Sequence, residues 1–566
     1  ASHARIRAAH PEVESTSVRV RGLERELLGD ARRPLVLLLG AAGFLLLVAC
    51  ANVTSTLLAR GMARRGELAV RASLGAGRGR LVRQLLAESV VLSALGALVA
   101  VPLAWGVLVL TSSLDPGAVP RLGEVALDGR TLLFTGGATL ATAALFGLLP
   151  AVQLTRDLGG RLRAGRVAGA DRRARATWRV LMAGEVALAL VLVAGAGLTL
   201  RSLSEILTRD LGYSPRGVVA GELHLPPEKY ASAAEAVEWI DGLLETLDVA
   251  PGVGAAGLNV LLPVRGRGAL GSPVILEDGE RSEAVFQYRV ADGGWFRALD
   301  VPLVRGRVFD DEDADGPHVA VVDEVMARSL WPGEDPLGKR FNAGGMDPYR
   351  DEWLTVVGVV GEVRTWSQDP GTNPTFYVSH RQRPAFLGLL GTAVVARTDD
   401  PARGVAVLRE TVRTMDPDVP VRAATLRSLL ADSAADRRFT GFVLGAFAAV
   451  SLLLAAVGVY GVVSYTVARR TREMGIRLAV GASPARLRGR VQGEALSVVA
   501  VGLVVGLLAS SALGAALESV LFEVSPLDPW TRFGAAAVLL ATAAVASWLP
   551  ARRSTRVDPV TVLRGE

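Results

Sequence analysis

Residues 60–88 form an arginine-rich stretch between two strongly apolar segments, and the stretch recurs without a gap at residues 466–494. Glu67 and Arg71 of the first copy correspond to Glu473 and Arg477 of the second, a constant offset of 406 positions. A repeat of this length in one register indicates two copies of one structural unit. The fold must therefore contain two similar loops, each flanked by apolar segments.

Seven apolar stretches are long enough to cross a hydrocarbon core of about 30 Å as helices. They lie near 35–58, 85–112, 131–154, 179–203, 440–467, 492–517 and 532–550. Of the 566 residues, 50% are hydrophobic and 21% are charged, a mixture that suits membrane spans joined to a sizeable soluble part. We therefore predict an α-helical membrane protein with about seven transmembrane helices in two repeats and a separate α+β domain.

The placement of arginine predicts the topology. Loop 59–84 carries seven arginines and one glutamate, and loop 468–490 carries the same numbers. By the positive-inside rule both loops are cytoplasmic, the N-terminus of the chain is outside and its C-terminus is inside. Four spans separate the two loops, so the copies share one orientation and are expected to be related by a pseudo-two-fold axis along the membrane normal. The basic residues do not follow a groove with aromatics, so nucleic acid is not an expected partner.

The repeat and the spans together predict six segments. They are a C-terminal remnant of a first external domain (1–34), a first membrane repeat (35–154), a flexible, basic cytoplasmic linker (155–178), a further transmembrane helix (179–204), an external α+β domain (205–438) and a second repeat (439–566). The first segment is interpreted as a remnant because it matches residues 407–440, which precede the second copy. The natural chain is accordingly expected to be longer, with one more span and one more external domain.

Each arginine-rich loop is expected to contain a short amphipathic helix along the cytoplasmic face. Glu67 and Arg71 are four residues apart in the favourable order for a helical ion pair. Leu68, Val70 and Leu74 supply an apolar surface, and a glycine ends the helix. Contact with lipid headgroups would explain the arginines alone. The shared pattern Glu-x-x-x-Arg-x-x-x-Gly-Ala favours docking of a partner instead.

The candidate docking residues occupy matching positions in the two copies. They are Glu67, Arg71, Gly75, Ala76 and Arg80 in the first, and Glu473, Arg477, Gly481, Ala482 and Arg486 in the second.

Three further acidic residues lie in or beside the spans. Glu88 and Glu494 stand where two spans enter the bilayer, and either cap a helix, pair with a loop arginine or relay protons. Glu185 lies either near the interface or inside the bundle. Asn52 ends the first span in a group of small polar residues, which serve either close helix packing or a transport path.

Residues 205–435 alternate between strand and helix patterns, as an α+β domain does. Strands are expected at 218–225, 272–277, 285–290, 318–323, 353–363 and 392–398, and helices at 233–247, 322–330 and 402–415. Residues 333–340 nearly match a phosphate-binding loop, but Arg340 replaces the magnesium-binding hydroxyl. The five histidines have no metal-ligand spacing, and no nucleophile lies beside a base. We therefore expect no catalytic activity, cofactor or metal in this chain.

Three sets of residues resemble the FtsX-like permeases of the MacB type. They are Glu-Leu-Ala-Val-Arg-Ala-Ser-Leu-Gly-Ala at 67–76, its echo at 473–482, and Leu-Pro-Ala-Arg-Arg-Ser-Thr-Arg-Val-Asp-Pro-Val at 549–560. Gly306–Phe309, Pro332–Lys339 and Val356–Val359 resemble the periplasmic core domain of that family. The doubled arrangement is similar to the duplicated orphan permeases within it.

This resemblance implies a subunit of a type VII ABC system. A separate cytosolic ATPase, in two copies, would bind the two loops and move the periplasmic domains, because the chain shows no Walker motif of its own. The implied location is the bacterial inner membrane, with a periplasmic adaptor or an outer-membrane channel as a further partner. Three functions fit: export of a substrate from the periplasm or the membrane, signalling to a periplasmic enzyme, and an ATPase-less scaffold.

Overall fold

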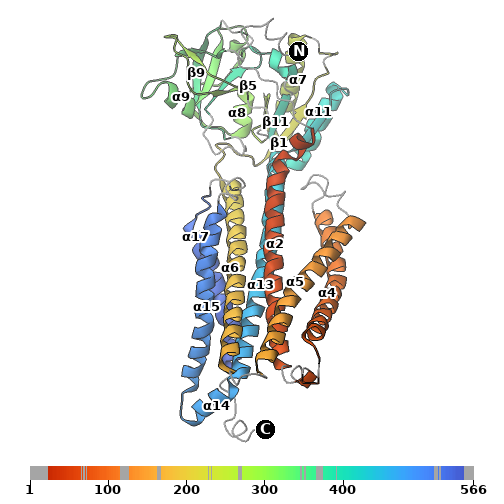
Figure 1. The fold of residues 1–566 in the computed structure, drawn as a ribbon. Coiled ribbons are helices and arrows are strands. Elements are labelled where there is room, and N and C mark those ends of the chain that lie inside the picture. Colours follow the sequence, from red (N-terminus) through yellow and green to blue (C-terminus); the bar gives the residue numbers. More distant parts are fainter. Residues whose placement is uncertain are drawn as a thin grey trace, which may run out of the picture. The chain divides into compact units, whose positions relative to one another are not determined.

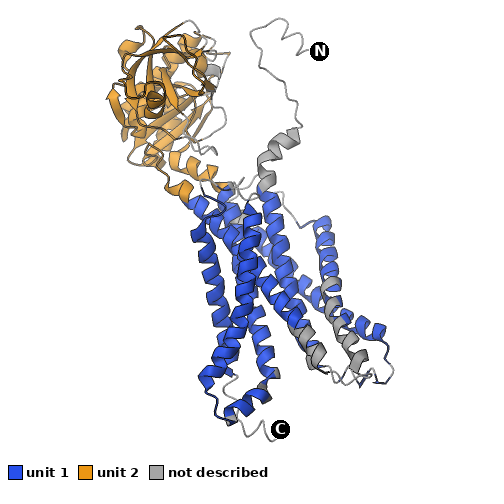
Figure 2. Cartoon of the chain, turned by 60° about the vertical axis from the view of Figure 1, so that its left-hand side comes forward, with its two compact units in different colours: residues 1–204, 437–566 blue, residues 205–436 orange. Residues whose placement is uncertain are grey.

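A computed structural model describes the protein in two compact units. One comprises residues 1–204 with 437–566, and the other comprises residues 205–436 (Figure 2). The described residues are 23–64, 67, 70, 71, 73, 74, 76–114, 127–161, 167–226, 228–230, 232–264, 270–344, 347, 349, 352–364, 374–389, 392–514, 521 and 524–553. Of the domain remnant expected at 1–34, residues 1–22 lie outside the described residues.

The first unit is built from long helices (Figure 1). They are α2 (Leu23–Ala63), α4 (Arg78–Leu114), α5 (Gly129–Arg161), α6 (Val167–Thr208), α13 (Ala435–Arg469), the short α14 (Thr471–Ala479), α15 (Pro484–Ala512) and α17 (Pro529–Arg553). Within the described residues, six of them are long and apolar enough to cross a membrane: α2, α4, α6, α13, α15 and α17. The span expected at 131–154 forms α5, a helix of 33 residues.

The repeat is visible in the helix boundaries. Helix α4 begins at Arg78 and α15 at Pro484, 406 positions later, and α2 and α13 end at Ala63 and Arg469 with the same offset. Helix α5 begins at Gly129 and α17 at Pro529, an offset of 400. The stretch from the start of the second span to the start of the third is therefore six residues shorter in the second copy, where α15 has 29 residues against 37 in α4.

The flexible linker expected at 155–178 is largely helical. Helix α5 continues to Arg161 and α6 already begins at Val167, so only residues 162–166 lie between them. The reason is composition: alanine and arginine dominate this stretch, and both have high helix propensity. High charge was thus a poor guide to flexibility here.

Helix α6 is the most enclosed of the spans. Its side chains Met182, Val186 and Leu190 share an apolar cluster with α13, α15 and α17. Two glycines of α15 allow this close approach, since a Cβ at Gly502 would lie 2.6 Å from the Ala183 carbonyl oxygen and one at Gly506 2.9 Å from that of Ala187. Small residues of this kind are what membrane helices use to pack closely.

The second unit is a mixed sheet with helices on both faces. Its strands are β1 (Val218–Leu223), β2 (Val253–Asn259), β3 (Leu270–Ser272), β4 (Ile275–Leu276), β5 (Phe286–Ala291), β6 (Leu303–Gly306), β7 (Val319–Asp323), β8 (Arg340–Asn342), β9 (Leu354–Val360), β10 (Thr375–Ser379), β11 (Thr392–Thr398) and β12 (Val421–Thr425). They follow the order β12-β1-β11-β2-β5-β10-β7-β9-β8-β4, with β3 beside β5 and β6 beside β9.

The helices of this unit are α7 (Ala233–Asp248), α8 (Gly293–Leu299), α9 (Glu324–Leu330), α10 (Ala385–Leu389), α11 (Pro401–Met415) and α12 (Leu426–Ser433). Alternate strand residues enter two cores, as the two-residue period of a strand requires. Val394 of β11 belongs to the core that also contains residues of α7, α9 and α11, whereas its neighbour Val395 belongs to the core that contains residues of α8 and α12.

All the strands and helices that the sequence predicts for this unit are present, but helices α8, α10 and α12 and strands β6, β8, β10, β12 and β2 were not predicted. Strand β2 shows one reason. Its sequence, VGAAGLN, lacks the β-branched and aromatic residues that mark strands. Gly257 explains why small residues stand there: a Cβ would lie 1.9 Å from the Trp295 nitrogen, where α8 packs on the strand. Tertiary packing thus selected residues that weaken the local signal.

The remaining motifs of this unit are structural. Residues 333–340 lead into strand β8 and not into a helix, and Lys339 pairs with Glu334 at 2.6 Å. A phosphate-binding loop needs a helix N-terminus at this point. Among the described residues, no cluster of His, Cys, Asp and Glu could hold a metal ion.

Asp416 should contribute a pH-dependent part of the stability of this unit. Its carboxylate accepts from Lys229 Nζ at 2.7 Å and Tyr230 Oη at 2.5 Å, and these bonds lower its pKa from 3.8 to about 2. A lowered pKa stabilises the fold above pH 4, and this contribution is lost as the pH falls from about 4 to about 2. Asp416→Asn should cost about 1.5–3 kcal/mol at pH 7 and progressively less toward pH 2.

Unfolding of the full chain, followed by tryptophan fluorescence, tests this expectation, since Trp239 lies edge-on to Tyr230 at 5.9 Å. Asp418→Asn is the matched control, because Asp418 also contacts Lys229 but is largely exposed. An Asp416→Asn deficit that stayed the same at pH 3 and pH 7 would contradict the assignment.

Candidate functional site

The second arginine-rich loop contains a helix, α14, with a glycine-terminated end. Gly481 follows the helix at φ +94°, in the left-handed region that glycine adopts without strain. The Ala482 N–H donates to the Arg477 carbonyl at 2.9 Å and the Gly481 N–H to that of Leu478 at 3.0 Å. These two bonds form a Schellman cap. Ser483 then caps α15 by accepting from the Arg486 N–H, so the loop turns sharply between two helices.

The first loop repeats this geometry where it is described. Residues 67, 70, 71 and 73 are helical, and the Ala76 N–H donates to the Arg71 carbonyl at 3.0 Å, the counterpart of the bond from Ala482. Gly75 and Leu68 lie outside the described residues. The equivalent backbone bonds show that the sequence repeat is also a structural repeat.

In the first loop, five side chains form a closed polar ring. Arg64 donates to Glu67 at 2.9 Å and to Glu88 at 3.2 Å. Arg71 donates to Glu67 at 2.6 Å and to Gln84 at 2.8 Å, and Gln84 closes the ring by donating to Glu88 at 3.4 Å. The ring ties the loop helix to α2 and α4, which fixes the direction in which the loop projects.

The second loop keeps two of the three ion pairs of this ring. Arg470 contacts Glu494 at 2.9 Å and Arg477 contacts Glu473 at 2.7 Å. The counterpart of Gln84 is Arg490, a cation that contacts Glu494 at 3.9 Å. Arg490 cannot accept a bond from Arg477 as Gln84 accepts one from Arg71, so this loop is braced differently.

Hydrogen bonding favours the charged forms of the first ring. The bond from Arg64 lowers the pKa of the Glu67 carboxyl, and the bonds to Glu67 and Glu88 raise the pKa of Arg64. Both glutamates at the points of membrane entry, Glu88 and Glu494, thus lie against an arginine 24 residues earlier in the chain. Sequence reasoning offered this pairing as one alternative but did not identify the arginine.

Two aliphatic side chains in each loop project into solvent. Val70 and Leu74 are 59% and 82% exposed, and their counterparts 406 positions later, Ile476 and Val480, are 45% and 84% exposed. The ion pairs hold the backbone while these side chains remain uncovered. Sequence reasoning noted the apolar surface but did not single out these residues as a site, although their matched positions in the repeat were the signal that could have found them.

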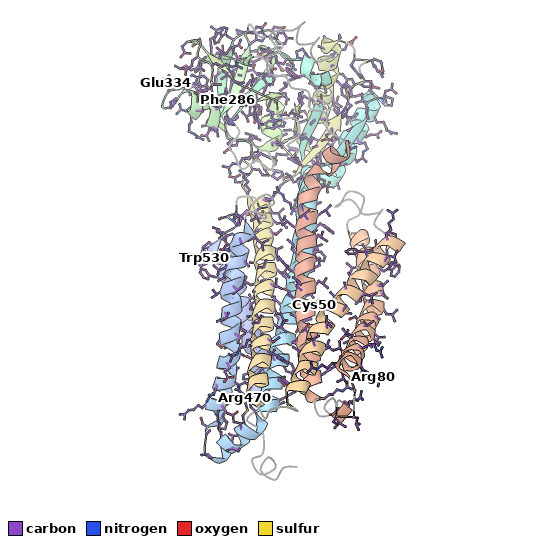
Figure 3. The ribbon with its side chains drawn as sticks, in the orientation of Figure 1. Cys50, Arg80, Phe286, Glu334, Arg470 and Trp530 are labelled. Carbon is purple, nitrogen blue, oxygen red and sulfur yellow. The ribbon has the colours of Figure 1, made fainter. Side chains whose placement is uncertain are left out.

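Arg80 and Arg486 lie in the first turn of the helices that follow the loops, α4 and α15, and both are exposed. Figure 3 shows Arg80 and Arg470 at the same end of the helical unit. The loops therefore present positive charge beside the exposed aliphatic pairs, all on one side of the membrane-spanning helices.

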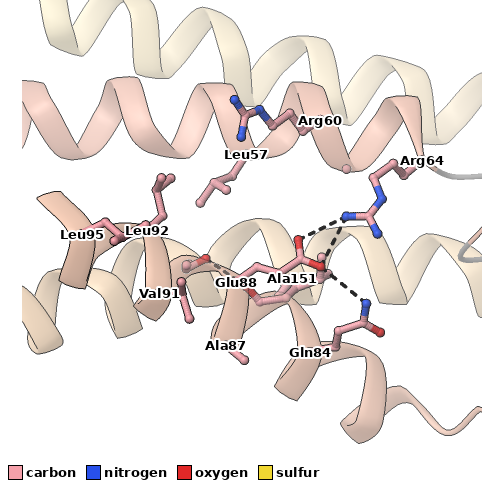
Figure 4. Close-up of a pocket in the computed structure, with 14 residues that line it drawn as sticks. Leu57, Arg60, Arg64, Gln84, Ala87, Glu88, Val91, Leu92, Leu95 and Ala151 are labelled. Carbon is pink, nitrogen blue, oxygen red and sulfur yellow. Dashed lines mark hydrogen bonds and ion pairs between the residues drawn. The ribbon is translucent and has the colours of Figure 1, made fainter.

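A cavity of about 690 Å³ borders the first ring (Figure 4). Arg64, Gln84 and Glu88 line its polar end, and Leu57, Val91, Leu92 and Leu95 line its apolar part. In the second copy the counterpart of Leu57 is Val463, which packs against α6 in the apolar cluster that contains Met182 and Val186. The helix before the first loop thus borders a cavity, whereas the corresponding position before the second loop lies in an apolar cluster.

Family models match both units. The model of the FtsX-like permease C-terminal domain matches residues 39–157 and again 445–559, and that of the MacB-like periplasmic core domain matches residues 184–414. Two matches to one permease model agree with the two copies of the loop. The chain belongs to the FtsX-like, MacB-type permeases of ABC transporters.

Similar curated proteins are larger. The chain is 31% identical over 285 residues to the macrolide export ATP-binding/permease protein MacB of Azoarcus sp., a match that covers 48% of this chain and 41% of that protein. It is 26% identical over 410 residues to the pyoverdine export ATP-binding/permease protein PvdT of Pseudomonas entomophila, covering 69% and 59%. The chain thus spans about half the length of the curated relatives it matches.

Two solved structures are similar to part of this chain. The periplasmic region of MacB from Actinobacillus actinomycetemcomitans is 14% identical with a TM-score of 0.28, covering 40% of this chain and 95% of that one. The extracellular domain of the transporter YknZ from Gram-positive bacteria is 17% identical with a TM-score of 0.24, covering 36% and 99%.

Proposed function

We propose that this chain is the permease subunit of a type VII ABC system in the bacterial inner membrane. In this proposal a separate cytosolic ABC ATPase, in two copies, binds the two loops, and its ATP hydrolysis moves the periplasmic domains. This movement of the periplasmic domains exports or extrudes a substrate from the periplasm or the membrane. The basic loops and the C-terminus are cytoplasmic, and the N-terminus of this chain is periplasmic, as the placement of arginine favours.

One observation carries the proposal: the two loops present matching aliphatic pairs on a braced backbone. Lipid headgroups require positive charge but not the same two exposed side chains in both copies. A pair of identical ATPase subunits would meet each loop in the same way, because a two-fold arrangement presents equivalent surfaces. The difference between Gln84 and Arg490 implies that the two contacts differ in strength.

Two other functions use the same loops. An FtsX-like signalling permease would regulate a periplasmic enzyme, and a scaffold would have lost its ATPase. The retained ion pairs in both loops favour an energised protein over the scaffold. Neighbouring genes separate the first two: an adaptor and an outer-membrane channel support export, and a cell-wall hydrolase supports signalling.

Charge reversal of both loop glutamates tests the docking of the ATPase. Glu67→Lys with Glu473→Lys places a cation beside Arg71 and Arg477, which opens both ion pairs and repels the neighbouring arginines. We expect the ATPase recovered with the purified full chain, and the ATPase rate that the chain stimulates, to fall about tenfold or more, the effect of about 1.4 kcal/mol.

Glu410→Lys is the control, because it breaks an exposed arginine–glutamate pair in α11 of the second unit. It should leave ATPase recovery and rate unchanged. Equal recovery and rate in the double loop variant and the parent chain would remove the docking proposal.

A further inference from the structure

Glu185 lies inside the helical unit and not at its surface. Its side chain projects from α6 and the residue is 4% exposed. The Asn52 side-chain amide of α2 donates to Glu185 Oε1 at 2.6 Å and to the Leu454 carbonyl oxygen of α13 at 2.8 Å. One amide therefore connects α2 of the first repeat both to α6 and to α13 of the second repeat.

The repeat explains how room for this carboxylate arises. Asn52 and Gly458 occupy the same position in the two copies, 406 residues apart, and both lie against Glu185. A Cβ at Gly458 would lie 2.3 Å from Glu185 Oε2 and 2.7 Å from Oε1. The position thus supplies a hydrogen-bond donor from one copy and the space for the carboxylate from the other.

The neighbouring contacts between the repeats are apolar. Ala41 of α2 packs with Leu444 and Ala448 of α13 and with Leu192 and Ala196 of α6. Lipid tails are as apolar as these side chains, so such contacts select one helix register only weakly. A buried polar contact can select a register, because shifting a helix would leave its donor and acceptor unpaired in a hydrophobic medium.

We propose that Glu185 is a positioning residue that acts through Asn52 and sets the register and approach of α2 against α13. The acceptor oxygen of Glu185, and not its charge, sets this register, so glutamine can replace the glutamate. If the proposed function holds, any movement that separates the two repeats in the membrane must break this contact. The proposal about the contact itself does not depend on an ATPase.

Oxidative cross-linking between α2 and α13 in the full chain tests the proposal. Cys50→Ala removes the single native cysteine, and Ala41→Cys with Leu444→Cys reports on the approach of the two helices. Hydrogen bonds between membrane helices correspond to factors of about 3 to 18. We expect Asn52→Leu and Glu185→Leu each to lower the cross-linking rate by such a factor, and the two together to lower it no further.

Three variants sharpen the test. Glu185→Gln keeps an acceptor and should cross-link at the parent rate, whereas Gly458→Ala keeps both polar groups, displaces the carboxylate and should behave like Glu185→Leu. Ser451→Ala is the control, because this buried hydroxyl donates to the Ala448 carbonyl within α13 and, among the described residues, to no other helix. Each variant is measured as a monodisperse species in detergent.

A parent-like rate in both Glu185→Leu and Gly458→Ala would overturn the proposal. Loss of cross-linking in Glu185→Gln equal to that in Glu185→Leu would also overturn it, since the charge and not the acceptor would then be required.

Discussion

Replacing Leu74 and Val480 with aspartate is expected to abolish association of the chain with its ATPase. Among the described residues of the two loops, these two aliphatic side chains are the most exposed. An aspartate there would have to be desolvated against an apolar partner surface and would remove the contact as well. Central interface residues contribute about 2 kcal/mol or more each, so the double substitution should weaken binding by about 100-fold or more. Binding of the purified ATPase to the full chain measures this.

Val249→Asp is the matched control. Val249 is an equally exposed valine, but it lies at the end of α7 in the second unit. Its substitution should change neither binding nor ATPase rate. The single variants should differ, because the loop around Leu74 is braced by the closed ring and the loop around Val480 is not. ATPase binding that survived both aspartates would assign the aliphatic pairs to the lipid headgroup region instead.

Replacing Arg383 with methionine should lower the free energy of unfolding of the second unit by more than Asp416→Asn does. The Arg383 side chain is 0% exposed, and its Nε donates at 2.8 Å to Asp347, which is 2% exposed. Its guanidinium also stacks over the Tyr349 ring at 4.5 Å. Removing the cation leaves a buried carboxylate without its partner, which costs about 3–5 kcal/mol. Fluorescence-detected unfolding of the full chain measures the change.

Arg413→Met tests the same chemistry on the surface. Arg413 pairs with Glu410 at 2.8 Å, but both are well exposed and screened by solvent, so the loss of stability should be far smaller than that of Arg383→Met. Adding Asp347→Asn to Arg383→Met should recover part of the loss, because the unpaired charge is then removed. A double variant less stable than the sum of the singles would contradict this account.

Local chemistry was predictable from the sequence. The pairs Glu67–Arg71 and Glu473–Arg477 follow from a four-residue spacing on a helix, and the glycine that ends α14 follows from its place after the last apolar residue. The strands β7 and β9 follow from runs of valine. Each of these signals lies within a few residues of chain, where backbone geometry fixes which side chains meet.

Contacts between distant residues were not predictable. Arg64 meets Glu88 because α2 and α4 both pack on α5, and the sequence offers several arginines for that role. The same holds for Asn52 and Glu185, which are 133 residues apart. Helix α6 was expected to follow a flexible linker, yet it begins within that segment, because local helix propensity outweighed the high charge.

The sequence by itself determined that this chain holds two copies of one membrane unit, each with a charged loop, around an α+β domain. Hydropathy and register carry that information because apolar length and repeat spacing act along the chain. Only the tertiary structure decided which partners the buried charges take and which loop side chains remain uncovered. Those outcomes depend on how the helices approach one another, where a single glycine or asparagine sets the fit.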